Sequence, residues 1–211
     1  KAQRQQLMRQ TACAYAIAEE ESPASTAPTG VPVLHWSAVL AQCTDRCLPP
    51  AGVTADQPWL YVSGSGSTGQ PKVIPITHRQ EWARTRSAAA GLPYEADDIV
   101  YPMLGMGFSS AKRRSLEAWC CGCAIYLAKA APLALSDLVL QKRISVIHTT
   151  VFHTESLLAQ LPPATEGWLQ NAKALFLGAS LVSHHLRLRI QKQLTPRLYV
   201  RYGANETGTI S

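Results

Sequence analysis

Apolar segments with strand character alternate with helix-forming segments from residue 59 onward, and this alternation limits the fold more than any other feature of the sequence. Strands are predicted at residues 59–62, 73–76, 99–104, 123–127, 144–148, 174–177 and 198–202. Helices are predicted at residues 77–91, 110–121, 137–143, 154–161 and 183–194. Such alternation is typical of parallel strands joined by crossover helices. The sequence therefore predicts an α/β fold with a mostly parallel sheet flanked by helices.

Short polar residues mark several of the expected helix starts. Thr77 begins a capping box, and Ser136 and Thr154 are candidate N-caps. Upstream, residues 2–20 contain alanine, glutamine and glutamate without a helix breaker, and they predict a helix. Residues 22–32 are rich in proline, serine and threonine, and they predict a linker or an exposed loop.

The composition is that of a chain with a buried core. Hydrophobic residues make up 46% of the 211 positions and charged residues 16%, which argues against disorder. The net charge is +6, but the basic residues are scattered apart from Lys112, Arg113 and Arg114, whereas nucleic-acid binders gather them on one face. A positive surplus suits ATP, pyrophosphate or an acidic substrate. We expect no nucleic-acid partner and no membrane span, since no apolar run reaches ~20 residues.

Six cysteines are present: Cys13, Cys43, Cys47, Cys120, Cys121 and Cys123. Cys43 and Cys47 together with Cys120 and Cys123 have spacings that allow a zinc site. The second pair, however, lies in the apolar stretch 119–127, so buried reduced thiols are the interpretation that we prefer. Reduced thiols favour a reducing compartment, and a cytoplasmic location is expected.

One loop has the chemistry of an anion-binding site. Residues 61–72 read Tyr-Val-Ser-Gly-Ser-Gly-Ser-Thr-Gly-Gln-Pro-Lys. Small residues let backbone N–H groups approach an anion closely. The hydroxyl groups of Ser65, Ser67 and Thr68 add donors, and Lys72 adds a positive charge. The segment therefore predicts a phosphate-binding loop.

Two known phosphate-binding patterns fit this loop poorly. A Walker loop needs Lys and then Ser or Thr directly after its second glycine, but Gln70 and Pro71 follow Gly69. A dinucleotide fingerprint needs a helix that opens within the loop, but Pro71 and the β-branched residues 73–76 indicate a strand. A merely flexible Gly/Ser turn would not need the terminal Pro-Lys.

The sequence Ser-Gly-Ser-Thr-Gly-Gln-Pro-Lys at residues 65–72 resembles the signature loop of the adenylate-forming superfamily. This superfamily includes acyl-CoA synthetases, acyl-ACP ligases and nonribosomal-peptide adenylation domains. Val73 stands where the family usually has Gly.

A second match to the same superfamily lies far away in the sequence. Leu-Phe-Leu-Gly-Ala-Ser at residues 175–180 resembles the adenine-binding segment. Tyr202, Gly203 and Glu206 fit the Tyr-Gly-x-Thr-Glu motif that follows about two dozen residues later. Asn205 replaces the usual Thr, and its amide can donate a hydrogen bond in place of the hydroxyl.

The resemblance covers residues 58–211 and implies that they form the ATP/AMP-binding subdomain, part of the large N-terminal domain of an adenylate-forming enzyme. Residues 1–57 would be a helical N-terminal segment and linker. The ribose-binding Asp, the hinge and the C-terminal lid domain with its catalytic Lys have no match in the sequence. We therefore expect the isolated chain to be incomplete as an enzyme.

The reaction implied by the resemblance uses ATP to convert a carboxylic acid to an acyl-adenylate. The acyl group then passes to the thiol of CoA or of a phosphopantetheinyl carrier protein. The implied catalytic residues are Lys72, Thr68 and Glu206, with Glu206 as a ligand of Mg²⁺. The implied nucleotide-binding residues are Ser65, Gly66, Ser67, Thr68, Gly69 and Lys72 around the phosphates and Gly178, Ala179, Ser180, Tyr202, Gly203 and Asn205 around AMP.

The acid-binding segment is expected at residues 102–109. Phe108 is either a gate of the acid pocket or a core residue. Ser109 stands where relatives that select amino acids carry Asp. Because a neutral hydroxyl cannot pair with a buried α-ammonium, a fatty or aryl acid is predicted. Arg113 and Arg114 are expected on a solvated helix face, unless they face the pocket and repel an ammonium.

Two other function classes stay open at this point. A non-catalytic nucleotide-binding remnant or interaction module would keep the fold without turnover, and Asn205 favours it. A dinucleotide-dependent oxidoreductase fits only the glycine spacing of the loop. Several histidines have no motif support and are expected at the surface or in the core: His78, His148, His153, His184 and His185.

Overall fold

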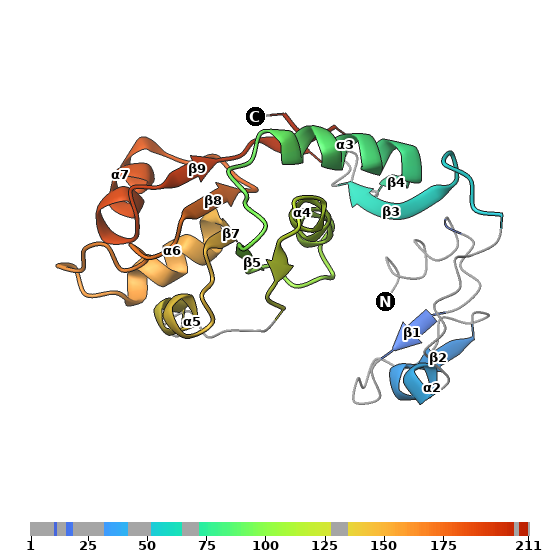
Figure 1. Cartoon of the computed structure of the whole chain (residues 1–211), viewed down its shortest axis with the longest axis horizontal. Helices are drawn as coiled ribbons and strands as arrows, with labels where there is room; N and C mark the ends of the chain where they lie inside the picture. The colour runs from blue at the N-terminus through green and yellow to red at the C-terminus, as the bar shows by residue number, and fades with distance from the viewer. Residues whose placement is uncertain are drawn as a thin grey trace. The chain divides into compact units, whose positions relative to one another are not determined.

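The computed structural model describes residue 11 and residues 16–18, 32–41, 52–64, 72–127, 135–204 and 207–210. The chain divides into two units, residues 1–79 and 80–211, and each is described by itself (Figure 1). The first unit contains β1 (Ala16–Ala18), β2 (Val33–His35), α2 (Trp36–Ala41), β3 (Pro58–Gly64) and β4 (Lys72–Thr77). Helix α3 (His78–Ala90) starts at the boundary.

Two strand pairs and helix α2 make up the regular structure described in the first unit, together with the start of α3. β1 and β2 pair in parallel, with Ala16 opposite Val33. The strand at residues 16–18 differs from the helix predicted over residues 2–20, because pairing with β2 outweighs local helix propensity. β3 and β4 are antiparallel, and Gly64 lies opposite Lys72.

The second unit is built on a five-stranded sheet in the order β6-β5-β7-β8-β9, and every pair in it is parallel. Its strands are β5 (Ile99–Pro102), β6 (Ala124–Ile125), β7 (Val146–Thr150), β8 (Ala174–Gly178) and β9 (Leu198–Val200). Its further helices are α4 (Ser109–Cys120), α5 (Leu135–Gln141), α6 (Val151–Gln160) and α7 (His184–Gln193). Two short strands, β10 (Gly203–Ala204) and β11 (Gly208–Thr209), pair antiparallel. The predicted α/β class with a parallel sheet is confirmed.

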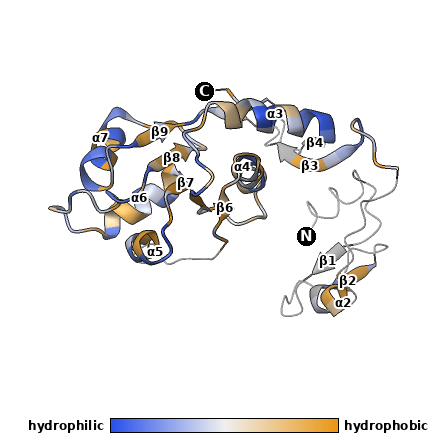
Figure 2. Cartoon of the chain, in the orientation of Figure 1, coloured by the Kyte–Doolittle hydropathy of each residue, from blue (hydrophilic) through white to orange (hydrophobic). Residues whose placement is uncertain are grey.

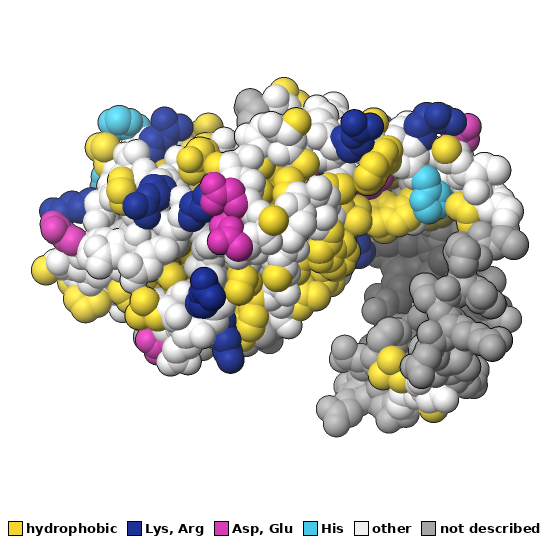
Figure 3. Space-filling view, viewed as in Figure 1, with side chains coloured by type: hydrophobic (Ala, Val, Ile, Leu, Met, Phe, Trp, Pro, Cys, Tyr) yellow, Lys and Arg dark blue, Asp and Glu magenta, His cyan; other side chains and the backbone are white. Residues whose placement is uncertain are grey.

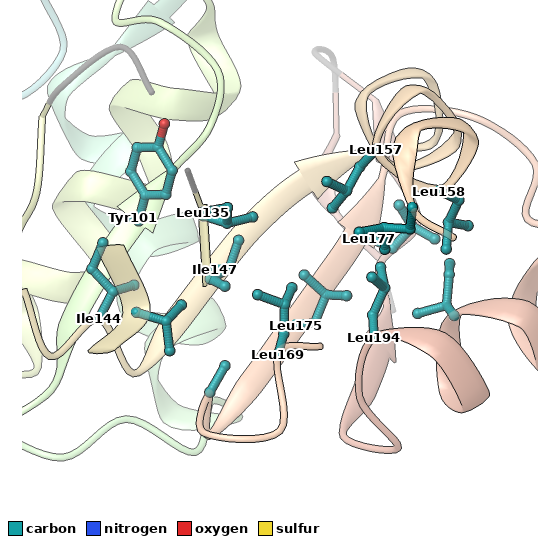
Figure 4. Close-up of a cluster of buried hydrophobic side chains, with 14 of the residues drawn as sticks. Tyr101, Leu135, Ile144, Ile147, Leu157, Leu158, Leu169, Leu175, Leu177 and Leu194 are labelled. Atoms are coloured by element: carbon teal, nitrogen blue, oxygen red, sulfur yellow. The ribbon is translucent and has the colours of Figure 1, made fainter. Parts of the chain in front are cut away.

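Alternate residues of the strands enter two separate cores. Val100, Val146 and Ala174 point to one face and pack with Ala118 of α4. The opposite face, which includes Ile147, buries its side chains against α5, α6 and α7. Figure 4 shows the leucines and isoleucines of this second core between strands and helices. The period of two follows from the pleat of a β-strand.

Two predicted N-cap residues lie inside their helices. Thr150, and not Thr154, caps α6, because the Thr150 side chain accepts a hydrogen bond from the His153 amide. Thr154 lies inside the helix, and its hydroxyl donates to the Thr150 carbonyl at 2.9 Å. Ser136 likewise lies within α5, which starts at Leu135. α6 gains a turn at its start, whereas α5 is shifted toward the N-terminus with its length unchanged, which includes the buried Leu135 in the helix.

The outer surface fits this layered arrangement. Figure 2 shows α7 with a hydrophilic outer side and hydrophobic residues toward the sheet. Lys and Arg side chains are spread over the visible face in Figure 3 and do not form one patch. In the described part of the chain, no helix has the length and apolar character needed to cross a membrane.

An aromatic stack crosses the sheet face that α4 covers. His148, Phe176 and Tyr199 occupy neighbouring positions on β7, β8 and β9. The His148 and Phe176 rings stack with centroids 4.6 Å apart, and the Phe176 and Tyr199 rings with centroids 5.0 Å apart. The Tyr94 hydroxyl is hydrogen-bonded to His148 Nε2. Burial and the nearby charge of Arg114 hold the pKa of His148 well below 6.5, so the imidazole is neutral.

This buried neutral histidine predicts acid sensitivity. Below pH 6.5 the unfolded chain protonates His148 while the folded chain does not, so the free energy of unfolding falls as the pH falls. The loss that His148 contributes approaches about 1.4 kcal/mol per pH unit. Glu117, whose pKa burial raises to about 7, contributes with the opposite sign in both the wild type and His148→Phe, so the difference between their slopes reports on His148. Urea unfolding of His148→Phe should show a shallower loss between pH 7 and pH 5 than the wild type. His185→Gln, on the exposed side of α7, is the control. An equal slope in wild type and His148→Phe would contradict the prediction.

Candidate functional site

The carboxyl ends of the five parallel strands meet at one edge of the sheet, and the candidate site lies there. β5 is the first strand of the sheet in sequence; β6 is added on one side of it and β7, β8 and β9 on the other. Ligands of such open α/β sheets bind outside the carboxyl ends, where the strand order reverses. The loops after β5, β7, β8 and β9 are therefore the segments that a ligand at this edge would contact.

The predicted phosphate loop joins β3 to β4 in the first unit. Gly64 pairs with Lys72 across the antiparallel strands, so residues 65–71 connect two strands. This context excludes the Walker and dinucleotide patterns, because both require a helix after the loop. Lys72 starts β4. The predicted ligands Ser65, Gly66, Ser67, Thr68 and Gly69 lie outside the described residues.

The two predicted adenine segments come together at the ends of β8 and β9. Gly178 closes β8, and the Arg201 amide donates to the Leu177 carbonyl at 2.8 Å. A Cβ atom at Gly178 would lie 3.1 Å from the Arg201 carbonyl oxygen, so glycine allows this close approach. Ala179 has φ 74°, a left-handed conformation that is rare for a residue with a side chain. Ala179 and Ser180 are exposed.

Tyr202 and Gly203 follow β9 directly. Tyr202 is 68% exposed, so its ring is accessible to a ligand. Gly203 lies opposite Thr209, and a Cβ atom at Gly203 would collide with the Gly208 carbonyl oxygen. The structure therefore explains why glycine follows Tyr202, because only glycine fits at the start of β10. Asn205 and Glu206 fall between β10 and β11 in sequence and lie outside the described residues.

The predicted acid-binding segment leads into α4. Phe108 is the N-cap residue of α4, and Ser109 is the first residue of the helix. Phe108 is 59% exposed, so its alternative interpretation as a core residue is wrong. The first turn of α4 has no acidic side chain.

Sequence reasoning missed two exposed apolar residues at the same edge. Phe152 follows β7 and is 75% exposed, and Leu181 follows β8 and is 92% exposed. With Phe108 and Tyr202, each of four neighbouring strands is followed by a large exposed apolar or aromatic side chain. Strand β7 ends at residue 150 and not at residue 148 as predicted, which is why the position of Phe152 at the strand end was not recognised.

The basic helix face predicted at residues 112–114 is largely buried. Arg113 is 6% exposed and its Nε lies 3.1 Å from Glu81 Oε1. Arg114 is 9% exposed and its Nη1 lies 2.9 Å from Glu117 Oε2. The expectation of a solvated face was wrong for both, because each guanidinium has a buried carboxylate partner that the helix period alone does not reveal.

Glu117 is the centre of a buried charge network. Its carboxylate also lies 3.0 Å from Arg201 Nη1. The contact with Arg114 Nη1 is an ion pair without hydrogen-bond geometry, since that nitrogen has no hydrogen-bond acceptor among the described residues. Burial raises the pKa of Glu117 to about 7, while Arg114 and Arg113 oppose the rise. Burial also lowers the pKa of Arg114.

One acidic group in the described residues has the geometry of a metal site. Oxygen atoms of Glu95, Asp97 and Asp98 lie within 4.8 Å of one another. Lys173 Nζ, however, contacts Glu95 at 2.7 Å and Asp98 at 3.0 Å. Asp98 and Lys173 precede β5 and β8, so this group lies at the amino ends of the strands, opposite the candidate site. We assign it to an ion-pair network.

Two curated proteins have related sequences. "Probable non-canonical nonribosomal peptide synthetase (NRPS) CymA" from Salinispora arenicola is 29% identical over 162 residues, 75% of this chain and 2% of that protein. "Delta-poly-L-ornithine synthetase" from Acinetobacter baumannii is 26% identical over 184 residues, 84% of this chain and 13% of that protein. The chain thus spans a small part of either relative.

The fold also matches solved adenylate-forming enzymes. The ATP-bound structure of MatB from Rhodopseudomonas palustris superposes with a TM-score of 0.82 at 16% identity, over 97% of this chain and 43% of that one. At this identity the likeness shows a shared fold. The family described as AMP-binding enzyme matches residues 3–211. Because this match extends over nearly the whole sequence, the chain belongs to the AMP-binding enzyme family, whose members are adenylate-forming ligases.

Proposed function

We propose that this chain forms the nucleotide-binding part of a ligase that activates a carboxylic acid with ATP. The observation that carries the proposal is the meeting of residues 178–180 with Tyr202 and Gly203 at the carboxyl ends of β8 and β9. Backbone groups at this edge and an exposed Tyr ring suit a flat purine base. The family of the chain supports the same assignment.

In the proposed reaction the substrate carboxylate attacks the α-phosphorus of ATP, and pyrophosphate leaves. The resulting acyl-adenylate passes its acyl group to the thiol of CoA or of a phosphopantetheinyl carrier protein. Backbone N–H groups of the loop at residues 65–69 and the Lys72 ammonium would bind the departing phosphates. Catalysis by such a site consists of positioning and neutralisation of charge.

Glu206 is the residue that we propose for Mg²⁺. A carboxylate together with phosphate oxygens is the donor set that this hard cation prefers. The bound ion would supply neutralisation of phosphate charge. Asn205, in place of the family's Thr, would donate its amide hydrogen to the α-phosphate.

The proposed substrate is a fatty or aryl acid without an α-ammonium. Ser109 begins α4, and the first turn of that helix contains no carboxylate to pair with an ammonium. The exposed apolar side chains of Phe108, Phe152 and Leu181 at the same edge suit an apolar acyl group. Cys120, Cys121 and Cys123 are free thiols, which supports our proposal of a reducing, cytoplasmic location.

The phosphate-loop assignment predicts a selective loss of ATP use. In the proposed ligase, Lys72→Ala and Thr68→Ala should each raise the KM for ATP roughly ten- to a hundredfold, because bonds to charged phosphate are worth ~1.5–3 kcal/mol. The KM for the acid should change little. ATP–pyrophosphate exchange measures both constants. Lys142→Ala, at an exposed position after α5, is the matched control. Wild-type ATP kinetics in both loop variants would refute the assignment.

The substrate proposal is tested with a panel of acids in the same exchange assay. Fatty and aromatic acids should be activated in preference to α-amino acids, including the ornithine that gives one relative its name. Ser109→Asp should reduce activity with apolar acids about tenfold or more, since it places an unpaired carboxylate beside the acyl group. Ser110→Asp, one position further around α4, is the control.

A preference of the wild type for any α-amino acid would contradict the substrate proposal and leave the activation of acids by ATP in place. ATP binding without pyrophosphate exchange on any acid would instead favour the non-catalytic nucleotide-binding remnant.

A further inference from the structure

We propose that Glu117 is a positioning residue of the nucleotide site, which holds the β10–β11 pair in place through Arg201 and Thr209. The inference rests on the proposed function, because that pair follows Tyr202 and encloses Asn205 and Glu206 in sequence. Glu117 itself belongs to α4, and its side chain is fully buried.

The first step is the fork between Glu117 and Arg201. Arg201 Nη1 donates to Glu117 Oε2 at 3.0 Å, and Nη2 donates to Oε1 at 3.5 Å. Two parallel contacts between a guanidinium and a carboxylate fix direction as well as distance. Because Arg201 immediately precedes Tyr202, the fork constrains the chain one residue before the proposed adenine contact.

The second step is a shared hydroxyl on β11. Arg201 Nη2 and Arg114 Nη2 both donate to Thr209 Oγ1 at 3.1 Å. Thr209 pairs with Gly203, and the Ile210 amide donates to the Tyr202 carbonyl at 2.8 Å. The Glu117 carboxylate therefore contacts Arg114 and Arg201, and both arginines donate a hydrogen bond to Thr209 Oγ1 on β11.

The network of Glu117, Arg114 and Arg201 contributes geometry and charge more than stability. Buried ion pairs often add little stability compared with apolar side chains of similar volume, because desolvation offsets the attraction. The geometry of a buried ion pair nevertheless fixes the relative position of the segments that it joins. With Glu117 ionised, as the two arginine contacts favour, Arg114, Arg201 and Glu117 together carry a net charge of +1, and protonation of Glu117 would add to it. A net positive charge in a low-dielectric surrounding suits an anionic nucleotide. We therefore expect two effects of the network: it positions the β10–β11 pair, and it provides a positive charge near the proposed nucleotide site.

The same helix supplies a matched control. Arg113 and Glu81 form a second buried ion pair, with exposures of 6% and 4% and a shortest contact of 3.1 Å. This pair joins α4 to α3, and both hydrogen bonds described for it run between these two helices. Its removal should cost stability without releasing β10 and β11.

The test compares Glu117→Gln, Thr209→Val and Thr209→Ser with Glu81→Gln in the 211-residue chain. Hydrogen exchange over residues 202–210 reports on the strand pair, AMP titration by calorimetry on the site, and melting temperature on the fold. Thr209→Val keeps the shape of the side chain and removes the hydroxyl, so it provides the test even if Glu117→Gln does not fold. Thr209→Ser retains the hydroxyl.

We expect Glu117→Gln and Thr209→Val to weaken AMP binding about tenfold or more and to speed exchange over residues 202–210. Thr209→Ser should recover most of the affinity that Thr209→Val loses. Glu81→Gln should lower the melting temperature with unchanged affinity and unchanged exchange in that segment. Unchanged exchange in both Glu117→Gln and Thr209→Val would overturn the inference, as would equal loss of affinity in Glu81→Gln.

The same experiment separates this inference from the proposed function. If the wild-type chain does not bind AMP, the nucleotide assignment fails for this chain. Exchange over residues 202–210 still decides whether Glu117 holds the strand pair. If the wild type binds AMP but Thr209→Val binds it equally well, the positioning role fails and the nucleotide site stands.

Discussion

The close parallel pairing of β8 with β9 is the constraint on which the candidate site depends. The Arg201 carbonyl lies so near Gly178 that a methyl group there would press against it at 3.1 Å. The backbone hydrogen bonds between β8 and β9 continue to Leu177. They bring residues 178–180 and residues 201–203, which α7 separates in sequence, to the same edge of the sheet. Beyond this edge the chain turns into β10, where Gly203 again leaves no room for a side chain. Two glycines thus determine where the proposed purine contacts lie.

Much of the fold follows from local sequence. The strand at residues 174–178 is continuously apolar and is buried on both faces, which is what a central parallel strand requires. Gly122 ends α4 with φ 80°, a conformation that favours glycine. The helix predicted over residues 183–194 is present as α7, and Ser183 is its N-cap, whose side chain accepts a hydrogen bond from the Leu186 amide. These features depend on neighbours within a few residues, and for this reason the sequence was sufficient to predict them.

The features that sequence reasoning missed depend on partners far away in the chain. Arg114 and Arg201 lie 87 positions apart in number, and no periodicity indicates that one carboxylate binds both. The strand at residues 16–18 exists because β2 pairs with it, against a helical composition. At the candidate site, motif spacing predicted that Gly178 and Tyr202 contact the nucleotide, and this stays a prediction. The exposure of Phe152 and Leu181 became evident only from the ends of the folded strands.

Ala179 holds the proposed binding loop in one conformation at an energetic cost. A left-handed backbone at a residue with a Cβ atom raises the energy of the loop by roughly 1–2 kcal/mol relative to glycine. A glycine there would relieve that energy but would also visit many more conformations before the ligand arrives. The methyl group of Ala179 therefore restricts the loop already in the folded protein, before any ligand binds. For the proposed nucleotide, less free energy would be lost on binding to order the loop.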